Sequence, residues 1–290
     1  MVTAVIPSYD PDPATLRTLT TALTSVGIPS VVVANGQGAL DVCRAHGIRH
    51  VSWGVNLGFG RSINRAVREL HIEDDLLVLN DDVEVDSAGL LRSLDAARGF
   101  GDGPWLLSLG REQTRPTPNL WEVFSNVSLL DRITTRFRAP LPTLDGVTGF
   151  KAFSSVVISR NAWAAVDGFD ERYPFAFEDA DFARSVAEQG AAFHSEREVS
   201  VVHHHSRTSS AHVERVLPLV VWSARCYLGK WQGRDLSVRG VLAAALLLRL
   251  VLMVGARAPV PSHARAVRAA ALTLLRTSEP ELPPFVRPWR

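Results

Sequence analysis

The sequence predicts an α/β fold with a mostly parallel sheet, followed by a C-terminal helical extension. Over about the first 100 residues, short runs of β-branched and aliphatic residues alternate with segments that suit helices, which is the pattern of successive βαβ units. These runs are apolar at consecutive positions, as in strands that are covered on both faces. From about residue 211 onward Leu, Val, Ala and Arg dominate, and this composition favours helices.

The first part of the chain contains four predicted strands, at residues 3–7, 30–34, 49–52 and 76–79. A helix is predicted between the first two strands, and it runs to about Gly27, because glycine commonly terminates helices. The apolar face of this helix consists of Leu16, Leu19, Leu23 and Val26. In a parallel sheet of this kind, ligands bind in the crevice at the carboxyl ends of the strands.

The regular alternation of strand-like and helix-like segments ends between Gly99 and Gly149, where Pro, Thr and Gly become frequent. We expect loops and irregular strands there, which commonly shape a substrate cleft. Beyond this region we predict strands at residues 156–159 and 199–202 and helices at residues 161–166 and 178–189. The predicted catalytic domain spans residues 1–210, with halves at about 1–100 and 101–210, and the helical extension spans residues 211–290.

With 290 residues and 46% hydrophobic content, the chain can bury a large core without disulfide or metal support. Cys43 and Cys226 are far apart and lack the spacing of a metal site, so we expect reduced thiols in a cytoplasmic protein. The N-terminus reads as a strand and not as a signal peptide. The longest apolar stretch, residues 241–255, is interrupted by Arg249 and is shorter than the roughly 20 residues that cross a bilayer, so no transmembrane segment is predicted.

The formal net charge of +1 combines an acidic first part with a basic C-terminal region, in which Trp222, Tyr227 and Trp231 accompany many arginines. Helices of this composition can lie in a membrane interface, where anionic headgroups attract them. We expect peripheral association with the inner face of the plasma membrane; a helical pair packed on the catalytic domain, or a homodimer contact, would explain the same pattern. Nucleic-acid binding is not expected, because the basic residues lie among aliphatic ones.

Asn80, Asp81 and Asp82 directly follow the predicted strand at residues 76–79. Paired acids at the carboxyl end of a parallel strand are well placed to hold a divalent cation, because Mg2+ and Mn2+ prefer oxygen ligands. An acidic turn, with Asp86 as the N-cap of the next helix, would account for the same residues without any ligand.

Glu178, Asp179 and Asp181 open a predicted helix directly after an aromatic run. The helix dipole favours carboxylates in a first turn, and this structural reason accounts for at least one of the three. Phe175 and Phe177 partly desolvate the cluster, which can keep one carboxylate basic enough to accept a proton from a substrate hydroxyl.

Two further patterns are less specific. His203, His204 and His205 follow the last predicted strand and could bind a metal or a phosphate, but strand alternation prevents all three from facing one site. A glycine-rich turn at residues 54–60 leads into a predicted helix and suits phosphate or nucleotide binding. The turn lacks the complete dinucleotide fingerprint, which argues against a Rossmann dehydrogenase.

The order of these segments along the chain is more specific than any one of them. The segments are Val5-Ile6-Pro7-Ser8-Tyr9-Asp10-Pro11, Val32-Val33-Ala34-Asn35-Gly36, Asn56-Leu57-Gly58-Phe59 with Asn64, Leu79-Asn80-Asp81-Asp82-Val83, Gly168-Phe169-Asp170-Glu171 and Glu178-Asp179-Ala180-Asp181. Over about residues 2–210 this order resembles the family 2 inverting glycosyltransferases, and most of all their rhamnosyltransferase-like branch. The resemblance implies a GT-A fold, in which a nucleotide-binding half with a Rossmann-like sheet joins an acceptor-binding half.

The resemblance also implies roles for individual residues. A nucleotide diphosphate sugar would be bound by Pro7, Ser8, Tyr9, Asn35, Asn56, Gly58, Asn64, Asn80 and Asp81. A divalent cation, Mg2+ or Mn2+, would be held by Asp82, with His204 as the first choice of histidine and His203 as the next. Asp179 falls at the position of the general base, and Glu178 and Asp181 accompany it in the same motif.

Two positions depart from the family pattern. Ala34 stands where the family usually has an Asp that contacts the base, and Asn80 stands where many relatives have the first acid of the metal-binding motif. The first departure implies different or looser recognition of the base. The second leaves less negative charge for a cation.

The activity that the resemblance implies is transfer of a sugar, such as rhamnose or another hexose, with inversion, to a saccharide or lipid-linked acceptor in cell-surface glycan assembly. Asp179 would take the proton of the acceptor hydroxyl, while a cation near Asp82 offsets charge on the departing diphosphate. A non-catalytic nucleotide-sugar or lipid-binding protein with a degenerate site is an alternative that Ala34 and Asn80 leave open. A sugar nucleotidylyltransferase fits less well, because no Gly-rich phosphate loop containing Arg and Lys lies near residue 10.

Overall fold

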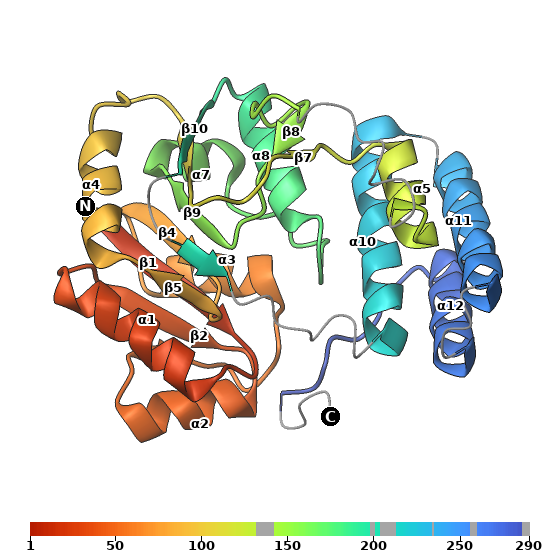
Figure 1. Cartoon of the computed structure of the whole chain (residues 1–290), viewed down its shortest axis with the longest axis horizontal. Helices are drawn as coiled ribbons and strands as arrows, with labels where there is room; N and C mark the ends of the chain where they lie inside the picture. Colours follow the sequence, from red (N-terminus) through yellow and green to blue (C-terminus); the bar gives the residue numbers. More distant parts are fainter. Residues whose placement is uncertain (132–141, 198–200, 204–212, 234, 256–259, 286–290) are drawn as a thin grey trace.

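The computed structural model describes residues 1–131, 142–197, 201–203, 213–233, 235–255 and 260–285. An α/β domain lies beside a group of long helices (Figure 1). The domain is built on a seven-stranded sheet of order β10-β6-β9-β4-β1-β2-β3. Its strands, in chain order, are β1 (Val2–Ser8), β2 (Ser30–Ala34), β3 (His50–Val51), β4 (Asp75–Leu79), β6 (Trp105–Leu109), β9 (Ser155–Ile158) and β10 (Ala192–Glu196).

The sheet is mostly parallel, as the sequence predicts. β1 lies parallel to both β2 and β4, β2 is parallel to β3, and β10 is parallel to β6. Only β9 runs the other way in this sheet, and it pairs antiparallel with β4 and β6. Because β1, β2 and β4 run in one direction, the segments that follow them begin at the same edge of the sheet.

Helices cover both faces of the sheet, and successive strand residues point to opposite sides. On one side Ala4 and Ile6 share a buried core with α1 (Pro13–Ser25), α2 (Gln37–His46) and α4 (Ser87–Ala97). On the other side Val5 shares a core with α3 (Phe59–Glu69), α7 (Arg160–Val166) and α8 (Glu178–Glu188). The apolar runs at the strand positions are therefore explained by two buried faces.

The described residues between Gly99 and Gly149 are more regular than the sequence suggested. β6 pairs with β9 and β10 inside the main sheet, and residues 120–128 form the helix α5 (Leu120–Ser128), which Asn119 caps. Five apolar or small residues without periodicity make β6 hard to recognise, and its partner β10 lies far along the chain. Two short sheets complete the domain: β5 (Val83–Val85) with β11 (Val201–His203), and β7 (Arg115–Pro116) with β8 (Gly149–Phe150).

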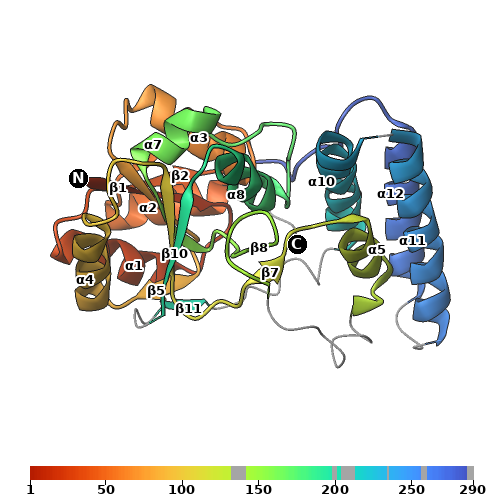
Figure 2. The same cartoon turned by 90° about the horizontal axis from the view of Figure 1, so that it is seen from above.

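The helical extension consists of α10 (Val213–Gln232), α11 (Asp235–Gly255) and α12 (Val260–Leu275). α5 packs against α11, so this helix of the first 210 residues lies with the extension (Figure 2). Arg249 on α11 is buried and donates a hydrogen bond of 2.9 Å to the carbonyl oxygen of Val127 on α5. After α12 the chain runs back to the α/β domain (Figure 1), where Phe285 packs against Leu40 of α2.

Within the described residues, one helix segment, Asp235–Met253 of α11, is long and apolar enough to cross a membrane, with a mean hydropathy of 2.0. The sequence-based expectation considered only the apolar run at residues 241–255, whereas the helix begins six residues earlier. A helix in the core of a soluble protein meets the same criterion, and 33% of this segment is buried against neighbouring helices.

Candidate active site

Ser8 and Asp81 meet at the carboxyl edge of the sheet, because β1 and β4 are parallel neighbours. The Ser8 hydroxyl donates a hydrogen bond of 2.6 Å to Oδ2 of Asp81. Burial, together with the neighbouring carboxylate of Asp82, raises the pKa of Asp81 to about 6, while the Ser8 hydroxyl opposes this rise. A divalent cation would relieve the repulsion between these two carboxylates, so the oxygen ligands at this edge suit Mg2+ or Mn2+.

The histidine predictions fall at the end of the described part of the chain. His203 ends β11, and its backbone lies opposite Val83 of β5, the residue directly after Asp82. The side chain of His203 and all of His204 lie outside the described residues. Among the side chains that the structure does describe, no three or more His, Cys, Asp or Glu residues are grouped so that they could hold a metal ion.

Glu178 and Asp179 open α8 directly after two strained residues. Ala176 and Phe177 have φ angles of 62° and 70°, in the left-handed region that residues other than glycine rarely adopt. Such strain is common at functional sites, where the surrounding packing maintains it. Here the Phe177 ring lies 5.5 Å from the ring of Tyr227 on α10.

The pKa values of both carboxyl groups are raised, for partly different reasons. Burial and the neighbouring Asp179 raise the pKa of Glu178 to about 8. Burial also raises the pKa of Asp179, but the N–H of Ala180, which donates to Asp179 at 2.8 Å, and the charge of Arg115 both oppose this rise. Both carboxyl groups therefore bind a proton more readily than exposed acids do, and the contacts with Ala180 and Arg115 favour the ionised form of Asp179.

Ser154 and Glu112 connect the two groups of acids. The N–H of Asn80 donates to the carbonyl oxygen of Ser154 at 2.9 Å, and the Ser154 hydroxyl donates to Oε1 of Glu112 at 2.6 Å. The charge of Glu112 in turn raises the pKa of Asp179. Asn80 is thus hydrogen-bonded to Ser154, and the partner of Ser154, Glu112, is near enough to Asp179 to influence its pKa. Glu112 and Ser154 come from stretches without a recognisable motif, so the sequence did not point to them.

Asp181 has different surroundings from Asp179, although both belong to one motif. Its side chain is almost fully buried, and Oδ1 accepts hydrogen bonds from the Tyr173 hydroxyl at 3.0 Å and from Trp231 Nε1 at 2.7 Å. Lys230 Nζ donates to Oδ2 at 2.7 Å. These contacts join α8 to α10, which is a sufficient structural reason for a carboxylate at this position.

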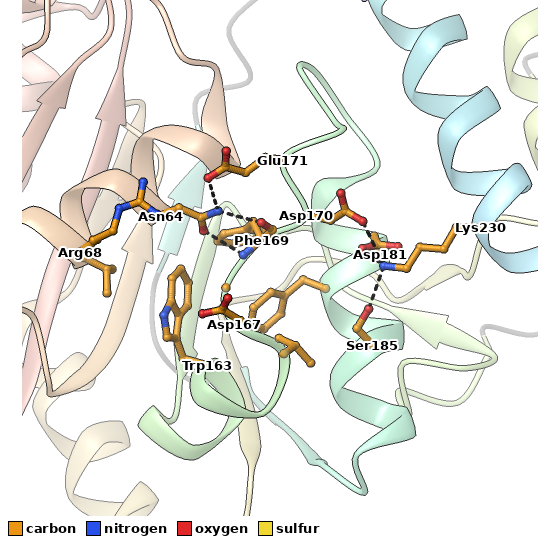
Figure 3. Close-up of a pocket in the computed structure, with 14 residues that line it drawn as sticks. Asn64, Arg68, Trp163, Asp167, Phe169, Asp170, Glu171, Asp181, Ser185 and Lys230 are labelled. Carbon is orange, nitrogen blue, oxygen red and sulfur yellow. Dashed lines mark hydrogen bonds and ion pairs between the residues drawn. The ribbon is translucent and has the colours of Figure 1, made fainter.

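A cavity of about 550 Å³ lies on this side of α8, between α3, α7 and α10 (Figure 3). Its lining includes Asp181 and Lys230 but neither Asp82 nor Asp179. Asn64 also lines it, and the Asn64 amide bonds both the N–H and the carbonyl oxygen of Phe169, at 2.9 and 2.8 Å. Asn64, predicted to line the nucleotide pocket, thus holds the loop that precedes the acidic motif.

The other predicted donor-binding residues gather around the turn before α3. Asn35 bonds Gly58 O at 3.2 Å and Leu57 N at 3.3 Å, and Oδ1 of Asn56 accepts from Gly58 N at 2.9 Å. Tyr9 follows β1 at the same edge. The Tyr9 hydroxyl and Asn56 Nδ2 donate hydrogen bonds to the C-terminal segment of the chain. The sequence did not predict that this segment lies here.

No protein-family model matches the chain. The chain is 26% identical over 281 residues to the N-acetylglucosaminyl-diphospho-decaprenol L-rhamnosyltransferase of Mycobacterium tuberculosis, covering 85% of this chain and 91% of that protein. Similar solved structures include S. aureus TarS 1-349, with a TM-score of 0.48, 12% identity and coverage of 94% and 90%. Glucosyl-3-phosphoglycerate synthase from M. tuberculosis, in complex with Mn2+, uridine diphosphate and glucosyl-3-phosphoglycerate, gives a TM-score of 0.48, 14% identity and coverage of 77% and 79%.

A mostly parallel sheet with acidic groups at its carboxyl edge, together with the sequence relative, defines the chain as a glycosyltransferase of the GT-A class. The relative, similar over most of both chains, confirms the resemblance to the rhamnosyltransferase-like branch of the family 2 glycosyltransferases.

Proposed function

We propose that the chain transfers a sugar from a nucleoside diphosphate to a hydroxyl of a lipid-linked saccharide, by single displacement with inversion. The observation that supports this proposal is the hydrogen-bonded series from Asn80 through Ser154 to Glu112, whose charge acts on Asp179. Asp82 belongs to the group suited to the departing diphosphate, and Asp179 to the group suited to the incoming hydroxyl.

Asp179 is the proposed general base. Burial raises its pKa above that of an exposed aspartate, so it is a stronger base and can accept the proton that the acceptor hydroxyl loses as its oxygen attacks the anomeric carbon. Glu178, whose pKa is raised to about 8, retains its own proton near neutral pH. We propose that it affects the reaction only through its interaction with Asp179. Asp181 is proposed to anchor α8 and not to touch the substrate, because its oxygens already accept three hydrogen bonds from within the protein.

Asp81 and Asp82, with His203 or His204, would hold a divalent cation, Mg2+ or Mn2+. When bound, the cation offsets the negative charge that develops on the leaving diphosphate. Ser8 orients the carboxylate of Asp81 and favours its ionised form. Asn80 is neutral, so the donor site carries one negative charge fewer than a site with three acids.

The acceptor and the donor sugar are proposed from the relative. Its name specifies an N-acetylglucosaminyl-diphospho-decaprenol acceptor and an L-rhamnosyl group. We propose the same class of acceptor here, a saccharide on an isoprenoid diphosphate, and L-rhamnose as the first sugar to test.

A lipid-linked acceptor requires the enzyme to work at a membrane, and the helical extension has a suitable surface for peripheral binding. Large apolar side chains are exposed on α11 and α12, at Leu236, Leu247, Val251, Leu272 and Leu275. Exposed arginines lie on or just after α12, at Arg265, Arg268 and Arg276. Apolar and basic side chains together suit the interface of an anionic bilayer.

The proposal is tested by incubating the full chain with a polyprenyl-diphosphate N-acetylglucosamine acceptor and Mn2+ or Mg2+. The donors are L-rhamnose carried on uridine, thymidine and guanosine diphosphate. We expect release of nucleoside diphosphate and an acceptor heavier by one sugar. Release of pyrophosphate would instead indicate a nucleotidylyltransferase, and binding of the donor without any product would indicate a non-catalytic protein.

A further inference from the structure

The C-terminal strap, defined here as residues 279–285, lies on the predicted donor-binding residues. Three consecutive carbonyl oxygens of the strap, those of residues 283 to 285, accept hydrogen bonds from the α/β domain. The donors are Asn56 Nδ2 at 3.0 Å, the Tyr9 hydroxyl at 2.9 Å and the backbone N–H of Gln37 at 2.8 Å. The strap is therefore bonded to the residue that follows β1, to the first residue of α2 and to the turn before α3.

The last residue of the strap fills an apolar niche at the end of β2. Phe285 is only 8% exposed and packs against Ala34, Ala39 and Leu40. Ala34 is the position at which the family pattern has an acid that contacts the base. A carboxylate beside the Phe285 ring would be desolvated without compensation, so Ala34 and Phe285 are chemically matched.

The other end of the strap is held by Arg61 on α3. Its two terminal nitrogens donate to the two carboxylate oxygens of Glu279 at 2.7 and 2.5 Å, and Nε donates to the carbonyl oxygen of Glu171 at 2.6 Å. A paired guanidinium and carboxylate of this geometry is strong and directional. Arg61 thus joins the strap to the loop that leads to the acidic motif.

The turn before α3 lies between the strap and that loop. Gly58 has a φ of 77°, and a Cβ placed on it would lie 2.5 Å from the carbonyl oxygen of Pro174 and 3.4 Å from Cδ1 of Leu282. The strap therefore contacts the donor-binding turn on one side, while the segment before Glu178 contacts it on the other. A shift of the strap would therefore disturb both the turn before α3 and the segment before Glu178.

We propose that the C-terminal strap forms the nucleobase-facing wall of the donor site, with Phe285 as a specificity-determining residue in place of the acid at residue 34. This inference rests on the proposed function, in which Tyr9, Asn35 and Asn56 bind the donor. The strap holds the side chains of Tyr9 and Asn56 in one orientation. Less conformational entropy is therefore lost when the nucleobase binds. A strap that left the site on each turnover would have to break its ion pair, three hydrogen bonds and the burial of Phe285, so a fixed wall fits the contacts better.

The test uses two full-length variants, Phe285→Ala and Glu279→Gln, which weaken the strap at opposite ends. Glu69→Gln is the matched control, because it removes a surface ion pair with Arg65 at the same helix α3. Calorimetric titrations with Mn2+ measure the Kd for uridine, thymidine and guanosine diphosphate and for inorganic pyrophosphate. Circular dichroism confirms that each variant is folded.

For the nucleoside diphosphate that the wild type binds best, both variants should weaken binding roughly tenfold, which is about 1.4 kcal/mol. The affinity of both variants for pyrophosphate should stay at the wild-type value. The Glu69→Gln control should bind both the nucleoside diphosphate and pyrophosphate as the wild type does. Tighter nucleotide binding in the variants would identify the strap as a competitor and overturn the inference. Unchanged binding, or an equal loss for pyrophosphate, would also overturn it and leave the proposed function intact. A wild type that binds none of the three nucleotides would overturn the proposed function itself.

Discussion

Lys230 on α10 donates a hydrogen bond of 2.7 Å to the carboxylate of Asp181 on α8, and that carboxylate is almost fully buried. The neighbouring Trp231 bonds the other oxygen of the same group. Since α8 begins with Glu178 and Asp179, the helical extension helps to hold the helix that carries the proposed base. The extension thus helps to hold the proposed active site in place.

Removal of Lys230 should destabilise the protein strongly. Lys230→Met leaves the buried Asp181 carboxylate without its cation, and breaking a buried ion pair in this way costs about 3 kcal/mol. Arg65→Met removes an exposed ion pair on α3 and should cost less than about 1 kcal/mol. Urea denaturation measures both free energies of unfolding, and equal losses would contradict the anchoring role.

Glu178 should make the folded protein less stable as the pH rises. Its pKa is about 8 in the folded protein against an ordinary value of 4.5, so between these values the unfolded chain releases a proton that the folded chain retains. Stability should therefore fall as the pH rises through this window and level off above it. Glu178→Gln should flatten the fall, as measured by urea denaturation between pH 5 and 9. If the free energy of unfolding fell equally with pH in the wild type and in Glu178→Gln, the raised pKa of Glu178 would be contradicted.

The Ser8 hydroxyl should set the pH range in which a cation binds. Its hydrogen bond lowers the pKa of Asp81, so Ser8→Ala should raise that pKa and leave more of the carboxyl protonated near pH 6. Binding of uridine diphosphate that depends on Mn2+ should weaken severalfold at pH 6 and little at pH 8. Calorimetry with and without a chelator measures this dependence. An equal loss at both pH values would contradict the explanation.

Exposed apolar residues on α11 should carry membrane binding. Replacing Leu247 and Val251, which are 66% and 67% exposed, by Glu should reduce sedimentation with anionic phospholipid vesicles roughly tenfold or more. Leu91→Glu is a control, because Leu91 is exposed on α4 of the α/β domain. The same binding by all three proteins would exclude this surface as the membrane contact.

The sequence predicted the strands of about the first 80 residues well, and the reason is local. β2 lies at residues 30–34 as predicted, and β1 and β4 lie within a residue of the predicted strands, because short buried strands between capped helices leave a clear pattern. The strand β6 was missed because its pairing with β9 and β10 depends on residues about 50 and 90 positions away.

In the candidate site, too, the sequence did not predict contacts between residues that are far apart in the chain. The resemblance placed the general base at Asp179, but it did not predict that Lys230 and Trp231, about 50 residues later, bind Asp181. The strap was not foreseen either, because a Pro-rich segment at residues 279–285 has no periodicity that predicts where it packs.

The identity of the general base is the central claim, and Asp179→Asn tests it most directly. The measurement is steady-state turnover of donor and acceptor, together with the Kd of the nucleoside diphosphate, for this variant and for Glu178→Gln. We expect kcat of Asp179→Asn to fall by about 10²- to 10⁴-fold while its nucleotide Kd stays near that of the wild type, and a smaller loss for Glu178→Gln. Turnover of Asp179→Asn at the wild-type rate would contradict the assignment.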